Sequence, residues 1–142
     1  MSKQGRDEHY VLDLCDVVLK ERALRQYRFD WLLGDPNANG RAARLPVDAY
    51  WPRANLVVEY REWQHDHPVR HFDKPDRLTV SGVHRGLQRA IYDARRDEQI
   101  PAHGIRLVII KPADLDSTSR GRLRRSWDSD LAAIERLLVE RD

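Results

Sequence analysis

The positions of apolar residues divide this chain into helical and extended segments. Near its start, Val11, Leu14 and Val18 recur at three- and four-residue steps, which is the periodicity of a helix. Short runs rich in aromatic and β-branched residues follow and are typical of strands. The pattern predicts, in order, a helix over 8–27, strands over 45–51 and 56–61, a helix from Ser81 to before Pro101, a strand over 105–110, and an amphipathic helix from about Ser119 onward.

The segments between these elements have the composition of loops. Residues 34–40 gather glycine, proline and asparagine, which favours a surface loop with turns. Residues 63–79 contain three histidines and two prolines without a clean period, so we expect an irregular excursion there. Residues 52–55 separate two strand-like runs, which predicts a hairpin of adjacent antiparallel strands.

Two acidic residues occupy matching positions on this hairpin. If it closes symmetrically with Arg53 and Ala54 at its tip, Asp48 lies opposite Glu59. Directly opposed Cβ atoms are about 4.5–5.5 Å apart, and like charges there destabilise a sheet. A hard divalent cation such as Mg²⁺ would compensate, because it accepts one or two carboxylates and completes its shell with water and phosphate oxygens.

Two further charged residues have suitable spacing. Strand alternation places Arg61 on the same face as Glu59. Glu21 follows Val17 by four residues and so falls within the apolar stripe of the predicted first helix, where a carboxylate needs a partner. The alternative is that both hairpin acids are exposed and neutralised by arginines, and the spacing alone supports that reading equally.

The hairpin also resembles a known family. Its sequence, LPVDAYWPRANLVVEYREWQH over 45–65, is similar to the core hairpin of PD-(D/E)XK nucleases, particularly the branch related to very-short-patch-repair endonucleases. The resemblance extends less sharply over most of the chain. It implies an α/β fold with a restriction-endonuclease-like core, a mixed β-sheet flanked by helices in the order αβββαβ, with an added C-terminal helix. One strand of that core is not located by the pattern, and the run Phe29–Leu33 is a candidate for it, beside the strand of Asp48.

The resemblance implies roles for particular residues. Asp48 and Glu59 match the metal-binding acids, Glu21 the helix-borne acid, and Gln64 the glutamine that follows the second acidic strand. Arg61 stands where the motif has lysine; arginine does not deprotonate, so it could stabilise charge but not act as a base. Asp48, Glu59, Arg61 and Gln64 are therefore the expected catalytic residues.

The expected activity is Mg²⁺-dependent endonucleolytic cleavage of DNA, with Mn²⁺ as a second candidate metal. The alternative is a nuclease-derived module that binds a nucleic acid or a protein partner without cutting. A basic face formed by Arg85, Arg89 and Arg96 on the predicted second helix would contact phosphates, although an ordinary solvated face fits the same spacing. His65, next to Gln64, is expected to border the site, whereas a zinc site built from nearby histidines is the weaker reading.

Composition narrows the class of protein without deciding its function. The 142 residues are 41% hydrophobic and 34% charged, which predicts one globular domain over 1–142 and excludes a disordered chain. No apolar run is long enough to cross a membrane. The single cysteine, Cys15, lies in an apolar stretch and is expected to be a buried thiol, which fits a cytoplasmic protein.

Charge and symmetry add three further expectations. The 25 cationic residues comprise 21 arginines and 4 lysines, a bias that suits phosphate recognition but that base composition also produces. The short arginine cluster at 120–125 is expected to be a solvated face. A homodimer is expected only on the general ground that symmetric homodimers are the commonest oligomers.

Overall fold

A computed structural model of the chain describes residues 3–62 and 85–139. The described part of the chain contains both helices and strands, and none of its helices is long and apolar enough to cross a membrane. The elements are, in order, α1 (Lys3–Leu19), β1 (Leu24–Leu33), β2 (Arg44–Trp51), β3 (Leu56–Tyr60), α2 (Arg85–Ala102), β4 (Arg106–Ile110), the short 3-10 helix η1 (Pro112–Asp114) and α3 (Trp127–Val139).

The four strands form one mixed sheet in the order β1-β2-β3-β4. β1 pairs with β2 and β2 with β3 in antiparallel fashion, whereas β3 and β4 are parallel. Trp51 lies opposite Leu56, which is the register predicted from a tip at Arg53 and Ala54. All five residues of β3 are buried, as expected for a central strand whose two faces are both covered.

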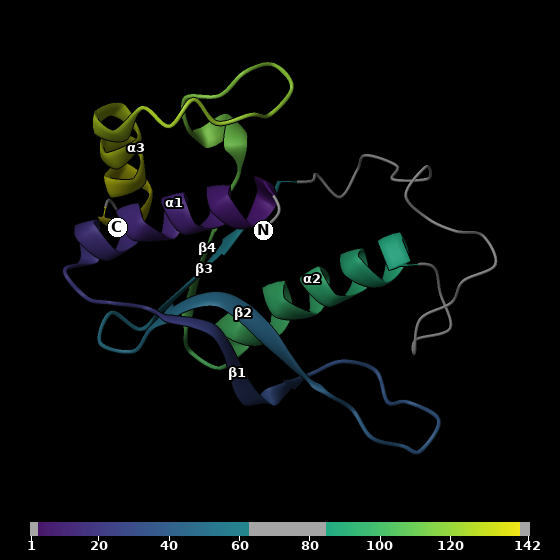
Figure 1. Ribbon diagram of the computed structural model, residues 1–142. Coiled ribbons are helices and arrows are strands. Elements are labelled where there is room, and N and C mark those ends of the chain that lie inside the picture. Colours follow the sequence, from purple (N-terminus) through teal and green to yellow (C-terminus); the bar gives the residue numbers. More distant parts are fainter. Residues whose placement is uncertain (1–2, 63–84, 140–142) are drawn as a thin grey trace.

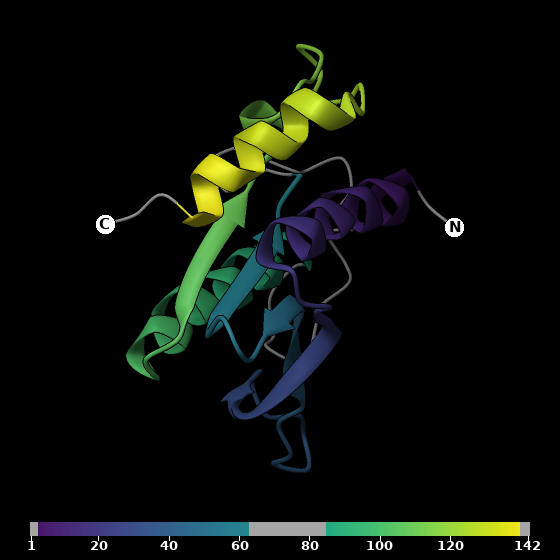
Figure 2. The same cartoon turned by 90° about the vertical axis from the view of Figure 1, so that its left-hand side faces the viewer.

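Helices cover both faces of the sheet, so the fold is α/β (Figures 1 and 2). Leu56 and Val58 of β3 face one core, which α1 and α3 complete with Leu12, Ile134 and other apolar side chains. The intervening Val57 faces a second core that includes Ile100 of α2. Alternation along a single strand therefore supplies both layers.

The predicted helix over 8–27 is wrong over residues 20–27. α1 ends at Leu19, Lys20 adopts a left-handed backbone (φ 55°), and β1 begins at Leu24. Tyr27, Phe29 and Trp31 then alternate along β1 and pack together on the side of the second core. This burial overrides the helical spacing of the preceding segment. β1 contains the run Phe29–Leu33, which the sequence indicates as the candidate for the strand that the pattern does not locate.

The other two predicted helices also differ from those observed. The second helix is predicted to end before Pro101 but continues through it to Ala102, and its Leu87 is exposed while Asp93 and Ile100 are buried. α3 begins at Trp127 rather than near Ser119, and Trp127 itself is 43% exposed. The buried face of each helix includes an acidic residue, Asp93 in α2 and Asp130 in α3, beside apolar ones.

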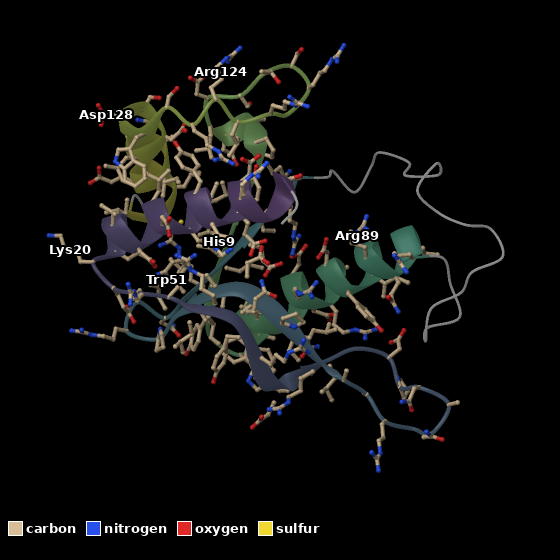
Figure 3. The ribbon with its side chains drawn as sticks, in the orientation of Figure 1. His9, Lys20, Trp51, Arg89, Arg124 and Asp128 are labelled. Atoms are coloured by element: carbon tan, nitrogen blue, oxygen red, sulfur yellow. The ribbon has the colours of Figure 1, made fainter. Side chains whose placement is uncertain are left out.

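Trp51 anchors α1 to the sheet. Its side chain is completely buried, and the indole Nε1 donates to Asp16 Oδ1 (2.9 Å) and to the backbone oxygen of Glu21 (3.0 Å). Asp16 Oδ1 also accepts the backbone N–H of Ala23 at 2.9 Å. One indole thus stabilises both the end of α1 and the turn into β1, as the position of Trp51 beneath α1 in Figure 3 illustrates.

We expect Trp51→Phe to lower the free energy of unfolding by about 2 kcal/mol or more, because two partly buried acceptors, Asp16 Oδ1 and the Glu21 carbonyl, lose their donor and the smaller ring leaves a void. Urea denaturation followed by circular dichroism measures this change. Trp127→Phe is the matched control: its ring is partly exposed and packs edge-on against Tyr10, so the change should stay within about 0.5 kcal/mol. Equal losses in the two variants would contradict the anchoring role.

Candidate active site

Asp48 and Glu59 lie where β2 and β3 stop pairing. The paired positions of the two strands end at Ala49 and Val58, one residue before the two acids. There the backbone N–H of Asp48 donates to Glu59 Oε2 (2.8 Å), and the backbone N–H of Tyr60 donates to Asp48 Oδ2 (2.8 Å). Each carboxylate thus takes the place of a backbone carbonyl as the acceptor of an N–H from the opposite strand. Asp48 and Glu59 lie opposite each other, as the sequence predicts.

These two carboxylates are in an environment that opposes their ionisation. Glu59 is only 4% exposed, and burial together with the neighbouring Asp48 raises its pKa. Burial likewise raises the pKa of Asp48, although the N–H of Tyr60 and the cations of Arg96 and Arg61 act in the opposite direction. The pair therefore carries an electrostatic cost that a bound cation would relieve.

One oxygen of each carboxylate remains available. Within the described residues, neither Asp48 Oδ1 nor Glu59 Oε1 accepts a hydrogen bond. Glu59 Oε1 lies 3.8 Å from Arg61 Nη2 and 4.0 Å from Arg96 Nε, which is ion-pair distance. Hard oxygen ligands of this kind suit Mg²⁺ or Mn²⁺, which retain several waters and need few protein carboxylates.

Glu8 of α1 is a third acid near this pair, and sequence reasoning missed it. Burial and the charge of Asp48 raise the pKa of Glu8 to about 7. Glu8 Oε2 accepts a hydrogen bond from Gln26 Nε2 at 3.2 Å. The signal was in the sequence, because Glu8 precedes the buried residues Leu12 and Cys15 by four and seven positions on the same helix face.

Gln26, which holds Glu8, has an unusual backbone. Its φ is 53°, a left-handed value that costs energy for a residue with a side chain. It lies between Arg25 and Tyr27, which pair with Ala49 and Val47, so the irregular residue is next to Asp48 across the β1–β2 ladder. Strain of this kind concentrates at functional sites, and here it adjoins the acidic pair.

The structure does not bring Glu21 to Asp48 and Glu59. Glu21 lies beyond the end of α1, and its Oε2 accepts the backbone N–H of Arg53 in the β2–β3 turn (3.2 Å). Three residues of β2, about 10 Å at the rise of a strand, separate Asp48 from Trp51 before that turn begins. The predicted position of Glu21 beside Asp48 and Glu59 is therefore corrected: α1 ends before Glu21, and the acid of α1 that Asp48 influences is Glu8.

Arg61 follows β3 and is held by α2. Its side chain is buried, and its guanidinium forms two bonds to Asp97, Nη2 to Oδ1 at 2.9 Å and Nη1 to Oδ2 at 3.3 Å. Its Nε lies 3.8 Å from Asp93 Oδ2 and makes no hydrogen bond within the described residues. The predicted proximity to Glu59 is confirmed, but the planar group is also a cross-link between sheet and helix, a geometry suited to arginine.

The basic face predicted on the second helix is only partly at the surface. Arg85 and Arg89 are exposed, and Arg89 extends from the N-terminal half of α2 (Figure 3). Arg96 instead faces the sheet, where its Nε donates to the Pro46 carbonyl (3.0 Å) and its Nη1 to Asp93 Oδ1 (2.9 Å). The assignment of Arg96 to a solvent-facing phosphate-binding surface is corrected, because the polar edge of the acidic site attracts it inward.

The two remaining predicted site residues, Gln64 and His65, lie outside the described residues, as do His67 and His71. Within the described residues, no group of three or more His, Cys, Asp or Glu side chains is arranged to hold a metal ion. A cation here would therefore rest on the two available oxygens of Asp48 and Glu59, with Glu8 as a nearby charge.

Comparisons with known proteins do not assign the chain to a family or a fold. No protein-family model matches the chain, and neither the curated proteins nor the solved structures include a significant match. The functional argument therefore rests on the arrangement of the chain's own residues.

The raised pKa of Glu8 has a consequence for stability. Between its ordinary pKa of 4.5 and about 7, the native state binds more protons at this group than the unfolded state does. The contribution of Glu8 to stability therefore falls as the pH rises through this window. We expect Glu8→Gln to be more stable than the wild type by about 1 kcal/mol at pH 8, an effect reduced by partial solvent exposure, and to lose this advantage below pH 4.5.

Urea denaturation in EDTA at a series of pH values measures this effect. Glu135→Gln on the exposed surface of α3 removes a similar charge and should give the same pH profile as the wild type. A Glu8→Gln profile parallel to that of the wild type would contradict the electrostatic crowding of Glu8 with Asp48.

Arg61→Lys tests the cross-link between β3 and α2. A lysine cannot form two parallel bonds to Asp97 while approaching Asp93, so we expect the free energy of unfolding to fall by about 1–3 kcal/mol. Arg136→Lys on the exposed side of α3 is the control and should change stability by less than about 0.5 kcal/mol. An Arg61→Lys variant as stable as the wild type would show that the bonds of Arg61 to Asp97 contribute nothing measurable to holding α2.

Proposed function

We propose that this domain is a divalent-metal-dependent nuclease that hydrolyses phosphodiester bonds in DNA. The observation that carries the proposal is the pair Asp48 and Glu59, opposed at the point where β2 and β3 separate. Each uses one oxygen to accept a backbone N–H and leaves the other without a hydrogen bond in the described part of the chain. This arrangement favours a cation between the two strands over a purely structural acid pair.

The fit to a hard cation follows from the chemistry of the donors. Two carboxylates with raised pKa values and a third acid, Glu8, nearby form a local excess of negative charge. A bound Mg²⁺ or Mn²⁺ would lower the pKa of a water and neutralise charge on a phosphate, which is the chemistry that hydrolysis needs. Asp48 and Glu59 would hold the metal through their available oxygens.

The surrounding residues have roles that do not depend on the metal. Arg61 and Arg96 place two permanent positive charges within 4.0 Å of Glu59. They limit the repulsion between the acids, and their field favours the extra negative charge that a phosphate gains on attack. Neither guanidinium can accept a proton, so a base for the attacking water is not among them. Arg85 and Arg89 on the exposed part of α2 provide sequence-independent contacts to a phosphate backbone.

The order of elements is further support. Helix α1, strands β1 to β3, helix α2 and strand β4 follow the αβββαβ order that the resemblance of the hairpin implies, with α3 as the added C-terminal helix. The acidic pair lies on the second and third strands, and Glu8 supplies the acid from the first helix.

A nuclease-derived module that binds without cutting is the second candidate function. The observation in its favour is that Arg61, which stands in the lysine position of the motif, is engaged with Asp97 and Asp93. A side chain bound in this way cannot move freely toward a substrate.

Cleavage assays separate the two. Supercoiled, linear and single-stranded DNA are incubated with the protein in Mg²⁺, Mn²⁺ or EDTA, beside Asp48→Asn and Glu59→Gln. We expect cleavage that requires the metal and falls by about 100-fold or more in both variants, because each removes a charged ligand worth several kcal/mol in the transition state. Asp30→Asn, which removes an exposed carboxylate from β1, is the control and should cut like the wild type.

Two outcomes would overturn the proposal that the domain is a nuclease. Cleavage that persists in both Asp48→Asn and Glu59→Gln would remove the site from the chemistry. Salt-dependent DNA binding without cleavage by the wild type would establish the binding module. If Arg61→Lys then cleaved DNA, the inactivity of the wild type would be due to the arginine at this position.

A further inference from the structure

A stiff hairpin-like turn precedes α3. Ser117 bridges Leu123, the backbone N–H of Thr118 donates to the carbonyl of Arg122 (2.8 Å), and that of Gly121 donates to the carbonyl of Thr118 (2.9 Å). Thr118 Oγ1 also accepts the backbone N–H groups of Arg120 (3.3 Å) and Arg122 (3.2 Å). Residues 117–123, here called the basic hairpin, thus have a fixed backbone although they lie outside the sheet of the domain.

The base of the basic hairpin is anchored to the domain through Asp116. The backbone N–H of Asp116 donates to the buried carboxylate of Asp130 (2.9 Å). The Asp116 carboxylate accepts bonds from Ser126 Oγ (2.5 Å) and Arg124 Nη1 (2.9 Å). Leu123 packs against the core beneath α3. Both strands of the turn are therefore held in place.

The four arginines of this region are used unequally. Arg124 and Arg125 are paired with Asp116 and Asp7. Arg120 and Arg122, at the tip, are exposed and have no side-chain partner among the described residues. Between them, Gly121 has a left-handed backbone (φ 82°), and a Cβ added there would meet nothing within 4 Å. The tip presents two free cations on either side of a backbone that a partner can approach closely.

The basic hairpin lies at the end of α1 that carries the acidic site. Arg125 Nη2 is 2.7 Å from Asp7 Oδ1, and Asp7 immediately precedes Glu8, whose pKa responds to Asp48. Figure 1 shows the loop above the first turns of α1, and Figure 3 shows Arg124 on its upper side. Four residues separate Arg125 from Gly121, so the tip lies within about 13 Å of that attachment point.

We propose that the basic hairpin binds the phosphodiester backbone of a nucleic acid through Arg120 and Arg122, at phosphates away from the bond that the acidic site cleaves. This inference rests on the proposed function in one respect, namely that the acidic site cleaves phosphodiester bonds. A rigid turn loses little backbone entropy on binding, and each guanidinium matches two oxygens of one phosphate. Two exposed cations on either side of Gly121 suit a polyanionic chain better than a single small phosphate ester.

The test is the salt dependence of binding to fluorescein-labelled duplex DNA and duplex RNA in EDTA, measured by fluorescence anisotropy. We expect Arg120→Ala with Arg122→Ala to weaken binding about tenfold or more at low salt. The slope of log K against log salt should decrease in magnitude by about 1.8, since each lost phosphate contact contributes about 0.9. An equal loss on DNA and RNA would identify the backbone as the ligand, whereas a loss on DNA alone would restrict the ligand to DNA.

Arg22→Ala with Arg53→Ala is the charge-matched control. These two exposed arginines lie beyond the other end of α1 and in the β2–β3 turn, and the slope of this variant should equal that of the wild type. Thermal unfolding of each variant checks that its fold is intact. If both double variants reduce the slope equally, net charge alone explains binding and the proposal fails.

A proximity experiment gives an independent result. Ser119→Cys at the tip can be labelled with a photoreactive group, because the native Cys15 is buried. The proposal is supported if the label crosslinks to duplex DNA or RNA and an excess of unlabelled duplex suppresses this crosslinking. The proposal is overturned if the slope of the double variant Arg120→Ala with Arg122→Ala is unchanged and no crosslink forms. It is also overturned if these arginines are needed for binding to anionic phosphatidylserine vesicles but not for binding to duplexes. A changed slope without metal-dependent cleavage would leave the hairpin as a binding element and reject only the nuclease.

Discussion

The structure depends on how two opposed carboxylates are accommodated between β2 and β3. Asp48 and Glu59 replace the backbone acceptors that a continuous ladder would supply, each taking one N–H from the other strand. Because both are acids in a largely buried position, the surrounding elements must supply positive charge or leave room for a cation. The end of strand pairing, the irregular Gln26 on β1 and the cations above Glu59 all occur at this one place.

Besides the apolar contacts of Ile100, charged side chains attach helix α2 to the sheet at this point. Arg61 from the sheet meets Asp97 and Asp93, and Arg96 from the helix meets the Pro46 carbonyl. Removing one member would leave a buried charge without its partner, which is costly. The same guanidinium groups that hold α2 are those within 4.0 Å of Glu59, so the position of the helix and the electrostatics of the acidic pair are coupled.

Helix α1 connects the acidic site with the rest of the molecule. Its inner face packs against the sheet, its C-terminal half fixes Trp51 and the turn into β1 through Asp16, and its N-terminal half carries Glu8 toward Asp48. Asp7, one residue earlier, holds Arg125 at the base of the basic hairpin. The N-terminal half of α1 therefore links the acidic pair on β2 and β3, through Glu8, to the basic hairpin, through Asp7.

Local periodicity and turn composition already specify the hairpin, the register that sets Asp48 opposite Glu59, the burial of Cys15 and a strand over 105–110, which the structure has at 106–110, because these are local properties that tertiary contacts here reinforce. Tertiary structure decided what local periodicity could not. The segment after Leu19 became strand β1 because its aromatic residues pack against the second core, and this change moved Glu21 away from the site. The inward face of α2 carries Asp93 and Arg96 because the buried charges of Glu59 and Arg61 require partners, a long-range electrostatic demand that no spacing along the helix contains.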